Sequence, residues 1–319
     1  MNIRRSTFPA AVAGAAVLAL TTTLTACSAD ATDGRTDGKL DVVASFYPMQ
    51  FLAERIGRGH VHVSSLTKAG AEPHDLDISA RQTADLSKAG LVVYLKGLQP
   101  AVDAAIVQAE PKHVADAASF TTLEDHGTEV DGDHGHDEHE HSGEDAGSDP
   151  HIWLDPVRYA QVAEGVGKAL QKADPDNAAD YKKNTAALVK QLGALNDDFR
   201  TGLKGRTSDT FITTHAAFGY LAERYGLRQE AISGIDPESE PSPARMKALH
   251  SVAEKEKVGT VFFETLVSDK TAKTLAGDLR LRTDVLDPIE GISDKSKGDD
   301  YFEVMHANLK ALETALGAK

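Results

Sequence analysis

The chain has 319 residues, a length that suggests about two domains, and its apolar content of 41% is enough to build ordinary hydrophobic cores. Its formal net charge of -15 and its isoelectric point near 5.3 argue against nucleic acid as a partner.

The first 28 residues have the pattern of an export signal. "MNIRRSTFPA" places two arginines at the start, and the apolar stretch at residues 10–20 is too short to span a membrane. "LTACS" at residues 24–28 resembles the bacterial lipobox, in which the cysteine is lipidated and becomes the mature N-terminus. We therefore expect a signal peptide over residues 1–26 and a lipid anchor on Cys27, which holds the protein to the outer face of the bacterial cell membrane. The alternative is an ordinary signal peptide with a chance cysteine.

Residues 27–38 are mostly small and polar and are predicted to form a flexible tether. Strand-like and helical patterns then alternate through "KLDVVASFYPMQFLAERIG", "HVHVSSLT", "SARQTADLSKAGLVVYLKG" and "QPAVDAAIVQAE". This alternation predicts an α/β lobe with a parallel sheet over residues 39–175.

Residues 124–149 interrupt the pattern. They are acidic, rich in histidine and without apolar periodicity, which predicts a disordered surface loop. A helix is predicted over residues 155–173, "DPVRYAQVAEGVGKALQKA", and Asp174-Pro175 ends it. Residues 176–204 then predict a helix longer than the average of ~11–12 residues. Two interpretations stay open from the pattern alone: a rigid connector between lobes, or a plain surface helix.

A second α/β series over residues 205–319 begins with the strand "TFITT" and closes with the helix "DYFEVMHANLKALETAL". Two similar α/β lobes joined by a helix predict a cleft protein, with its ligand at the carboxyl ends of the strands.

The histidines fall into three groups. Those of the acidic loop are candidate accessory metal ligands: His126, His134, His136, His139 and His141. A structural role is favoured for five others on strands or helices: His60, His62, His113, His250 and His306. The remaining three follow a strand or lie in a proline-pinned loop, where side chains face a cleft. These are His74, His151 and His215, and Glu290 after a later strand joins them.

Three histidines and one glutamate suit tetrahedral Zn2+, because imidazole is a preferred zinc ligand and a carboxylate adds charge neutralisation. A site for Mn2+ would be richer in oxygen. The nearby carboxylates Asp75, Asp149 and Asp155 could orient the imidazoles, although helix capping is at least as good an explanation for Asp155.

With these residues in view, the chain resembles the zinc-binding lipoproteins of bacterial ABC importers, the ZnuA-like cluster A-I solute-binding family. The resemblance begins near residue 39 and rests on "SFYPMQFLAERIG", "EPHDLDIS", "DPHIWLDP", "THAAFGYLAERYG", "GIDPESEPSPARM" and "VFFETLVSDKTAKTLA". It implies two α/β lobes joined by one long rigid helix, with the metal between the lobes.

The resemblance also implies the ligand set. His74, His151 and His215 fall on the family's three histidine motifs, and histidine at position 215 favours zinc because manganese-binding relatives commonly have glutamate there. The fourth ligand varies in the family, and Glu290 is preferred over Asp287, Glu264 or water. The chain departs from an "NG…E" pattern of the family, since Lys96 and Gln99 stand in "YLKGLQP".

The predicted function is therefore extracytoplasmic capture of Zn2+ by a monomer, without enzymatic activity, and delivery to an ABC permease in the membrane. The His-rich loop would serve as a weak accessory collector or sensor. Three alternatives remain: a manganese carrier, an adhesin and, less favoured, a zinc hydrolase in which Glu290 is a general base.

Overall fold

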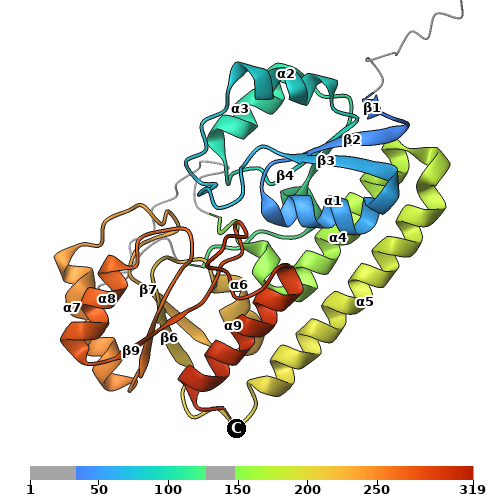
Figure 1. The fold of residues 1–319 in the computed structure, drawn as a ribbon. Helices are drawn as coiled ribbons and strands as arrows, with labels where there is room; N and C mark the ends of the chain where they lie inside the picture. Colours follow the sequence, from blue (N-terminus) through green and yellow to red (C-terminus); the bar gives the residue numbers. More distant parts are fainter. Residues whose placement is uncertain (1–33, 127–147, 319) are drawn as a thin grey trace, which may run out of the picture. The chain divides into compact units, whose positions relative to one another are not determined.

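Two sheets of mainly parallel strands, separated in the chain by two long helices, form the framework of the protein (Figure 1). The computed structural model describes residues 34–126 and 148–318. None of the helices in these two ranges combines the length and the apolarity needed to cross a bilayer. The predicted signal peptide and Cys27 lie outside the described residues.

The first sheet is built around β2 (Lys39–Ala44), which pairs in parallel with β3 (Val61–Ser65) and with β4 (Leu91–Tyr94). β5 (Val114–Asp116) extends the sheet beside β4. A short strand, β1 (Arg35–Thr36), pairs antiparallel with β2. Residues 35–36 were expected in the flexible tether, and that expectation is wrong for them, because β1 pairs with the sheet and Arg35 binds buried Asp174 at 2.6 Å.

The second sheet has the order β7-β6-β8-β9, and all its pairings are parallel. Its strands are β6 (Thr210–Thr213), β7 (Arg228–Ala231), β8 (Thr260–Phe263) and β9 (Arg282–Val285). The helices associated with the two sheets are α1 (Tyr47–Gly57), α2 (Ala80–Lys88), α3 (Pro100–Ala109), α4 (Pro156–Ala173), α6 (Gly219–Tyr225), α7 (Pro243–Lys255), α8 (Lys270–Leu279) and α9 (Tyr301–Leu316).

Side chains on both faces of each sheet are buried, which explains the nearly continuous apolar runs in the strands. Successive residues of a strand point to opposite faces, so Val42 packs into the large core while Val43 packs into a smaller core with α2 and α3. In the second sheet, Phe211 and Ile212 divide in the same way between the large core and a third cluster with α7 and α8. The predicted alternation of strands and helices is thus confirmed as a layered α/β fold.

The long helix predicted over residues 176–204 is observed as α5 (Ala178–Gly202), which follows a 3-10 turn at Pro175–Asn177. It contacts α1 and α4 on the side of the first sheet and α9 on the side of the second (Figure 1). Its buried apolar side chains lie along one face of the helix and join the large core: Tyr181, Leu188, Leu192, Leu195 and Phe199. This core contains residues from Leu40 to Leu316, so the two lobes share apolar packing as well as a connecting helix.

Candidate metal centre

Four segments that are far apart in the sequence supply the candidate ligands. His74 lies in the loop between β3 and α2, and His151 directly precedes a 3-10 turn (Ile152–Leu154) that leads into α4. His215 follows β6, and Glu290 lies in the loop between β9 and α9. Three of the four therefore lie beyond the carboxyl end of a parallel strand, the usual place for ligands in α/β folds.

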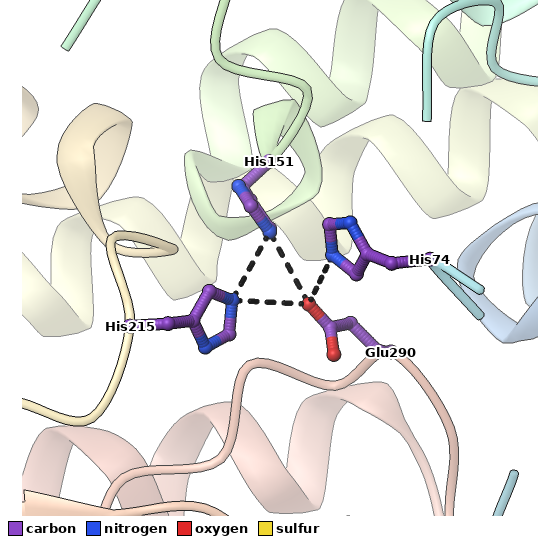
Figure 2. A group of neighbouring side chains, drawn as sticks. All are labelled: His74, His151, His215 and Glu290. Carbon is purple, nitrogen blue, oxygen red and sulfur yellow. Dashed lines mark hydrogen bonds and ion pairs between the residues drawn. The ribbon is translucent and has the colours of Figure 1, made fainter. Parts of the chain in front are cut away.

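The structure brings these four side chains together, as the sequence predicted. One ligand atom of each lies within 4.8 Å of the others, and Figure 2 shows the rings and the carboxylate pointing toward a common centre. Glu290 Oε1 lies 3.2 Å from Nε2 of His74 and of His151, and 3.4 Å from Nε2 of His215. The Nε2 atoms of His151 and His215 are 3.4 Å apart.

These separations fit a zinc ion. Zinc bonds to imidazole nitrogen and carboxylate oxygen are about 2.0–2.1 Å long, so adjacent ligand atoms of a tetrahedral site lie roughly 3.3 Å apart. In addition, Glu290 Oε2 is buried and has no hydrogen-bond partner among the described residues. A buried carboxylate oxygen without a partner is costly in a closed protein and is satisfied by a cation.

Two buried carboxylates fix the orientation of the imidazoles. Asp149 Oδ1 lies 2.8 Å from Nδ1 of His151, and Glu264 Oε1 lies 2.7 Å from Nδ1 of His215. A carboxylate on Nδ1 directs Nε2 toward the metal and makes the ring a stronger ligand. The orienting role of Asp149 was predicted. That of Glu264, which was weighed only as an alternative ligand, was missed. Its position directly after the apolar strand "VFF" was the available signal.

The loop that bears Glu290 is held firmly. Trp153 Nε1 donates a hydrogen bond to the Pro288 carbonyl oxygen at 2.7 Å, and Asp287 accepts a hydrogen bond from the Ile289 backbone at 2.8 Å. Ile289 has a φ of 59°, a left-handed conformation that is strained for a β-branched residue. Its side chain is fully buried, so packing and the Asp287 contact stabilise this turn. Asp287 thus shapes the loop.

The electrostatics of the site favour a bound positive charge. Burial alone would lower the pKa of His215, but Glu264 and Glu290 raise it well above its ordinary value. Burial likewise opposes the charged form of His151, and Asp149 and Glu290 raise its pKa. Burial would raise the pKa of Glu290, whereas hydrogen bonds from the three histidines hold it well below the usual range.

One side of the site is nearer to solvent than the rest. His74 has 11% of its side chain exposed, whereas the side chains of His151, His215 and Glu290 are fully buried. A cavity of about 460 Å³ that is lined in part by His74, Pro100, Ser148 and Ile235 lies next to it. An ion would therefore reach the centre past His74.

The prediction of a disordered loop over residues 124–149 is wrong at both ends of this range. Asp149 donates a backbone hydrogen bond to the Glu124 carbonyl at 2.9 Å, and the His126 ring packs on Tyr220 with centroids 4.3 Å apart. His126 was expected in the mobile tract with the other loop histidines, and it is instead half-buried against α6. His134, His136, His139 and His141 lie outside the described residues.

The structure also shows the environment of several other residues that the sequence singled out. Asp155 accepts a hydrogen bond from the Val157 backbone N–H at the start of α4, and it binds Arg224 at 2.6 Å. It therefore caps the helix, which was the alternative to its orienting an imidazole. Asp75 is exposed. Gln99, at the departure from the family pattern, is buried and donates to Thr67 and to the Pro73 carbonyl, which supports the loop that bears His74. Within the described residues, two groups of three or more potential ligands occur, and neither includes His60, His62, His113, His250 or His306.

Known proteins share this fold and much of this sequence. The zinc-binding lipoprotein AdcA of Streptococcus pneumoniae (strain TIGR4) is 37% identical over 295 residues, which cover 91% of this chain and 58% of AdcA. The chain thus spans a little more than half the length of that relative. The high-affinity zinc uptake system protein ZnuA of Bacillus subtilis is 34% identical over 308 residues, 92% of this chain and 94% of that protein.

A solved structure agrees with these relationships. Zn(II)-bound AdcA from Streptococcus pneumoniae superimposes with a TM-score of 0.73 and 32% identity, covering 88% of this chain and 59% of AdcA. Residues 42–315 match the family described as "Zinc-uptake complex component A periplasmic". The chain belongs to this ZnuA family of solute-binding proteins.

Proposed function

We propose that the protein is the extracytoplasmic zinc-binding component of an ABC importer. It holds one Zn2+ tightly with His74, His151, His215 and Glu290 and delivers the ion to a membrane permease. The observation that carries this proposal is the convergence of four ligand atoms from four distant segments in a site that is almost fully buried. Membership of the ZnuA family and the zinc-binding names of its relatives support it.

The donor set favours zinc over manganese. Three imidazole nitrogens and one carboxylate oxygen match the tetrahedral preference of Zn2+, whereas Mn2+ prefers a shell richer in oxygen. The separations of 3.2–3.4 Å between Glu290 Oε1 and the three Nε2 atoms suit four short bonds around one ion. A larger octahedral ion would require the imidazoles to move apart against their buried carboxylate partners.

Binding, and not hydrolysis, is the chemistry that this arrangement favours. A catalytic zinc keeps one position open for water, and four protein ligands fill a tetrahedron. Glu290 Oε1 lies among the three imidazole nitrogens, which is the place of a ligand. A general base would instead lie beyond a metal-bound water.

Further parts of the proposal concern the chain outside the described residues. We infer that Cys27 carries the lipid anchor and that the His-rich tract gathers zinc weakly, because each ion bound there must also order the chain. All four ligands of the tight site come from one chain, which supports action as a monomer.

A competition titration tests the proposal. The full-length protein is titrated with Zn2+ in the presence of a chromophoric chelator of known affinity, and Mn2+ is then offered in excess. We expect one zinc per chain to be withdrawn from the chelator and to resist Mn2+. Displacement of the tight zinc by Mn2+ would overturn the assignment of the metal. Zinc-dependent hydrolysis of model esters by the loaded protein would overturn the assignment as a binding protein.

A further inference from the structure

A second group of metal-ligating side chains lies at the base of the His-rich loop. Glu124, His126 and Glu223 each offer one atom, and these atoms lie within 4.8 Å of one another. His126 Nε2 is 3.1 Å from Glu223 Oε2 and 3.8 Å from Glu124 Oε2. Glu223 lies on α6, so the group joins the chain just before the His-rich tract to the helix that follows His215.

The two groups share one buried carboxylate. Asp149 is fully buried, and its Oδ1 contacts His151 Nδ1 at 2.8 Å while its Oδ2 contacts His126 Nδ1 at 3.0 Å. A carboxylate on Nδ1 is the arrangement that orients a metal-binding imidazole and strengthens its Nε2 as a ligand. His151 uses its Nε2 in the tight site. His126, oriented by the other oxygen of the same carboxylate, presents its Nε2 to two glutamates.

Packing fixes this second group in place. The Tyr220 hydroxyl accepts a hydrogen bond from the Glu124 backbone and donates one to the Asp149 carbonyl, both at 2.8 Å. Gly219, at the start of α6, leaves room for the imidazole, because a Cβ built there would lie 2.3 Å from the His126 Cβ. The ring therefore lies against the helix in a position that only a residue without a side chain allows.

The charges around the group set its strength. Arg158 contacts Glu124 and lies 3.7 Å from Glu223 Oε2, so it partly neutralises both carboxylates. Burial opposes charge on His126, and Asp149 and Glu223 raise its pKa. Glu223 is 53% exposed, and solvent screens its charge. Fewer ligands, one competing guanidinium and access to water all predict weaker binding than in the buried site.

We propose that Glu124, His126 and Glu223 form a second, weaker site for a divalent metal of the zinc type, joined to the tight site through Asp149. This inference extends the proposed function but does not require the tight site to be correct. The second site places an ion at the surface, next to the carboxylate that orients His151. His126, which is the last described residue before position 127, contributes directly to this site.

Zinc counting in a suitable background tests this site. His134, His136, His139 and His141 are replaced by Asn in the full-length chain, which removes the competing loop imidazoles. Native mass spectrometry with excess Zn2+ is expected to show two ions per chain, and titration gives their two dissociation constants. Glu223→Gln should then weaken the second ion at least about tenfold, since loss of an outer-shell partner alone typically costs 10–100-fold. A matched control is Glu164→Gln on exposed α4 surface, which makes the same charge change and should alter the second constant less than twofold.

The outcomes separate the two proposals. If only one ion binds and His215→Ala abolishes its binding, the proposal of a second site is wrong, while the assignment of the tight site still holds. Two ions that both persist in Glu223→Gln and in Glu124→Gln would also overturn it. Loss of only the weaker ion in these variants, and of only the tighter ion in His215→Ala, would support both sites. Thermal unfolding of each variant without metal shows whether the fold is retained.

Discussion

The two metal-ligating groups lie on opposite oxygens of Asp149, and they differ in almost everything else. The tight group has three imidazoles and one carboxylate, and three of its four side chains are fully buried. The second group has one imidazole and two carboxylates, and Arg158 contacts it. The contrast teaches that ligand type alone does not make a strong site. We expect the number of ligands, their burial and the absence of a competing cation to set the difference in affinity between the two proposed sites.

The largest effect is expected from His215→Ala. Structural zinc sites with four ligands bind with about 10–16 kcal/mol, so one ligand accounts for roughly 3 kcal/mol or more than about a hundredfold in affinity. The second group should keep its affinity. Chelator competition measures both constants, and His62→Ala, on an exposed strand position, is the matched control. A change below tenfold in His215→Ala would contradict the assignment of the tight ligand.

Asp149→Asn sharpens the comparison, because it is the one substitution that reaches both groups. The amide keeps the shape but cannot accept two N–H donors in the same way, and outer-shell losses typically reduce affinity by 10–100-fold. We expect both zinc constants to weaken. Glu264→Gln, which alters the contacts of Glu264 with Thr214 and His215 but no contact of the second group, should weaken the tight constant alone. If Asp149→Asn left the weaker ion unaffected, the two groups would not be linked.

The pH dependence follows from the direction of the pKa shifts. Neighbouring carboxylates raise the pKa of both His151 and His215, and zinc must replace those protons. As the pH decreases, the affinity of the tight site for zinc should therefore begin to fall at a pH above about 6.5, the unperturbed pKa of histidine. The fall should approach about tenfold per pH unit for each proton released. Titrations between pH 8.5 and 5.5 measure it, and a constant affinity down to pH 6 would contradict the shifts.

The smallest effect is expected from deleting residues 127–147, which leaves His126 and Asp149 in place. The tight constant should change less than about threefold, because none of its ligands or their orienting carboxylates is removed, while the total number of zinc ions per chain falls. Native mass spectrometry and chelator competition together give both quantities. Loss of the tight ion in this deletion would place the main site in the His-rich tract.

Much of the fold could be predicted because its patterns are local. The apolar strands, the Ser242 cap and Pro243 at the start of α7, and the long periodic face of α5 all appear in short stretches of sequence. The four candidate ligands of the proposed tight site could be predicted from their places in the chain and from the family resemblance. The shared core between the lobes was harder to predict, because this one cluster collects residues from all along the chain, from Leu40 to Leu316.

The remaining features depend on tertiary contacts that no local pattern encodes. Glu264 looks like any acidic residue after a strand until its contact with His215 is known. By composition His126 belongs to the acidic tract, but its side chain packs against α6 because Gly219 has no side chain there. Arg35 lies in a polar stretch, and its partner Asp174 is 139 residues away. In each case the partner, and not the residue itself, determines the structure.

Zinc-edge anomalous diffraction of the full-length protein loaded with one equivalent of Zn2+ tests the central claim most directly. We expect a single strong peak about 2.0–2.1 Å from Nε2 of His74, His151 and His215 and from a Glu290 carboxylate oxygen. If no peak appears at this centre and the ion is bound instead by His126 or by residues 127–147, the assignment of the tight site is wrong.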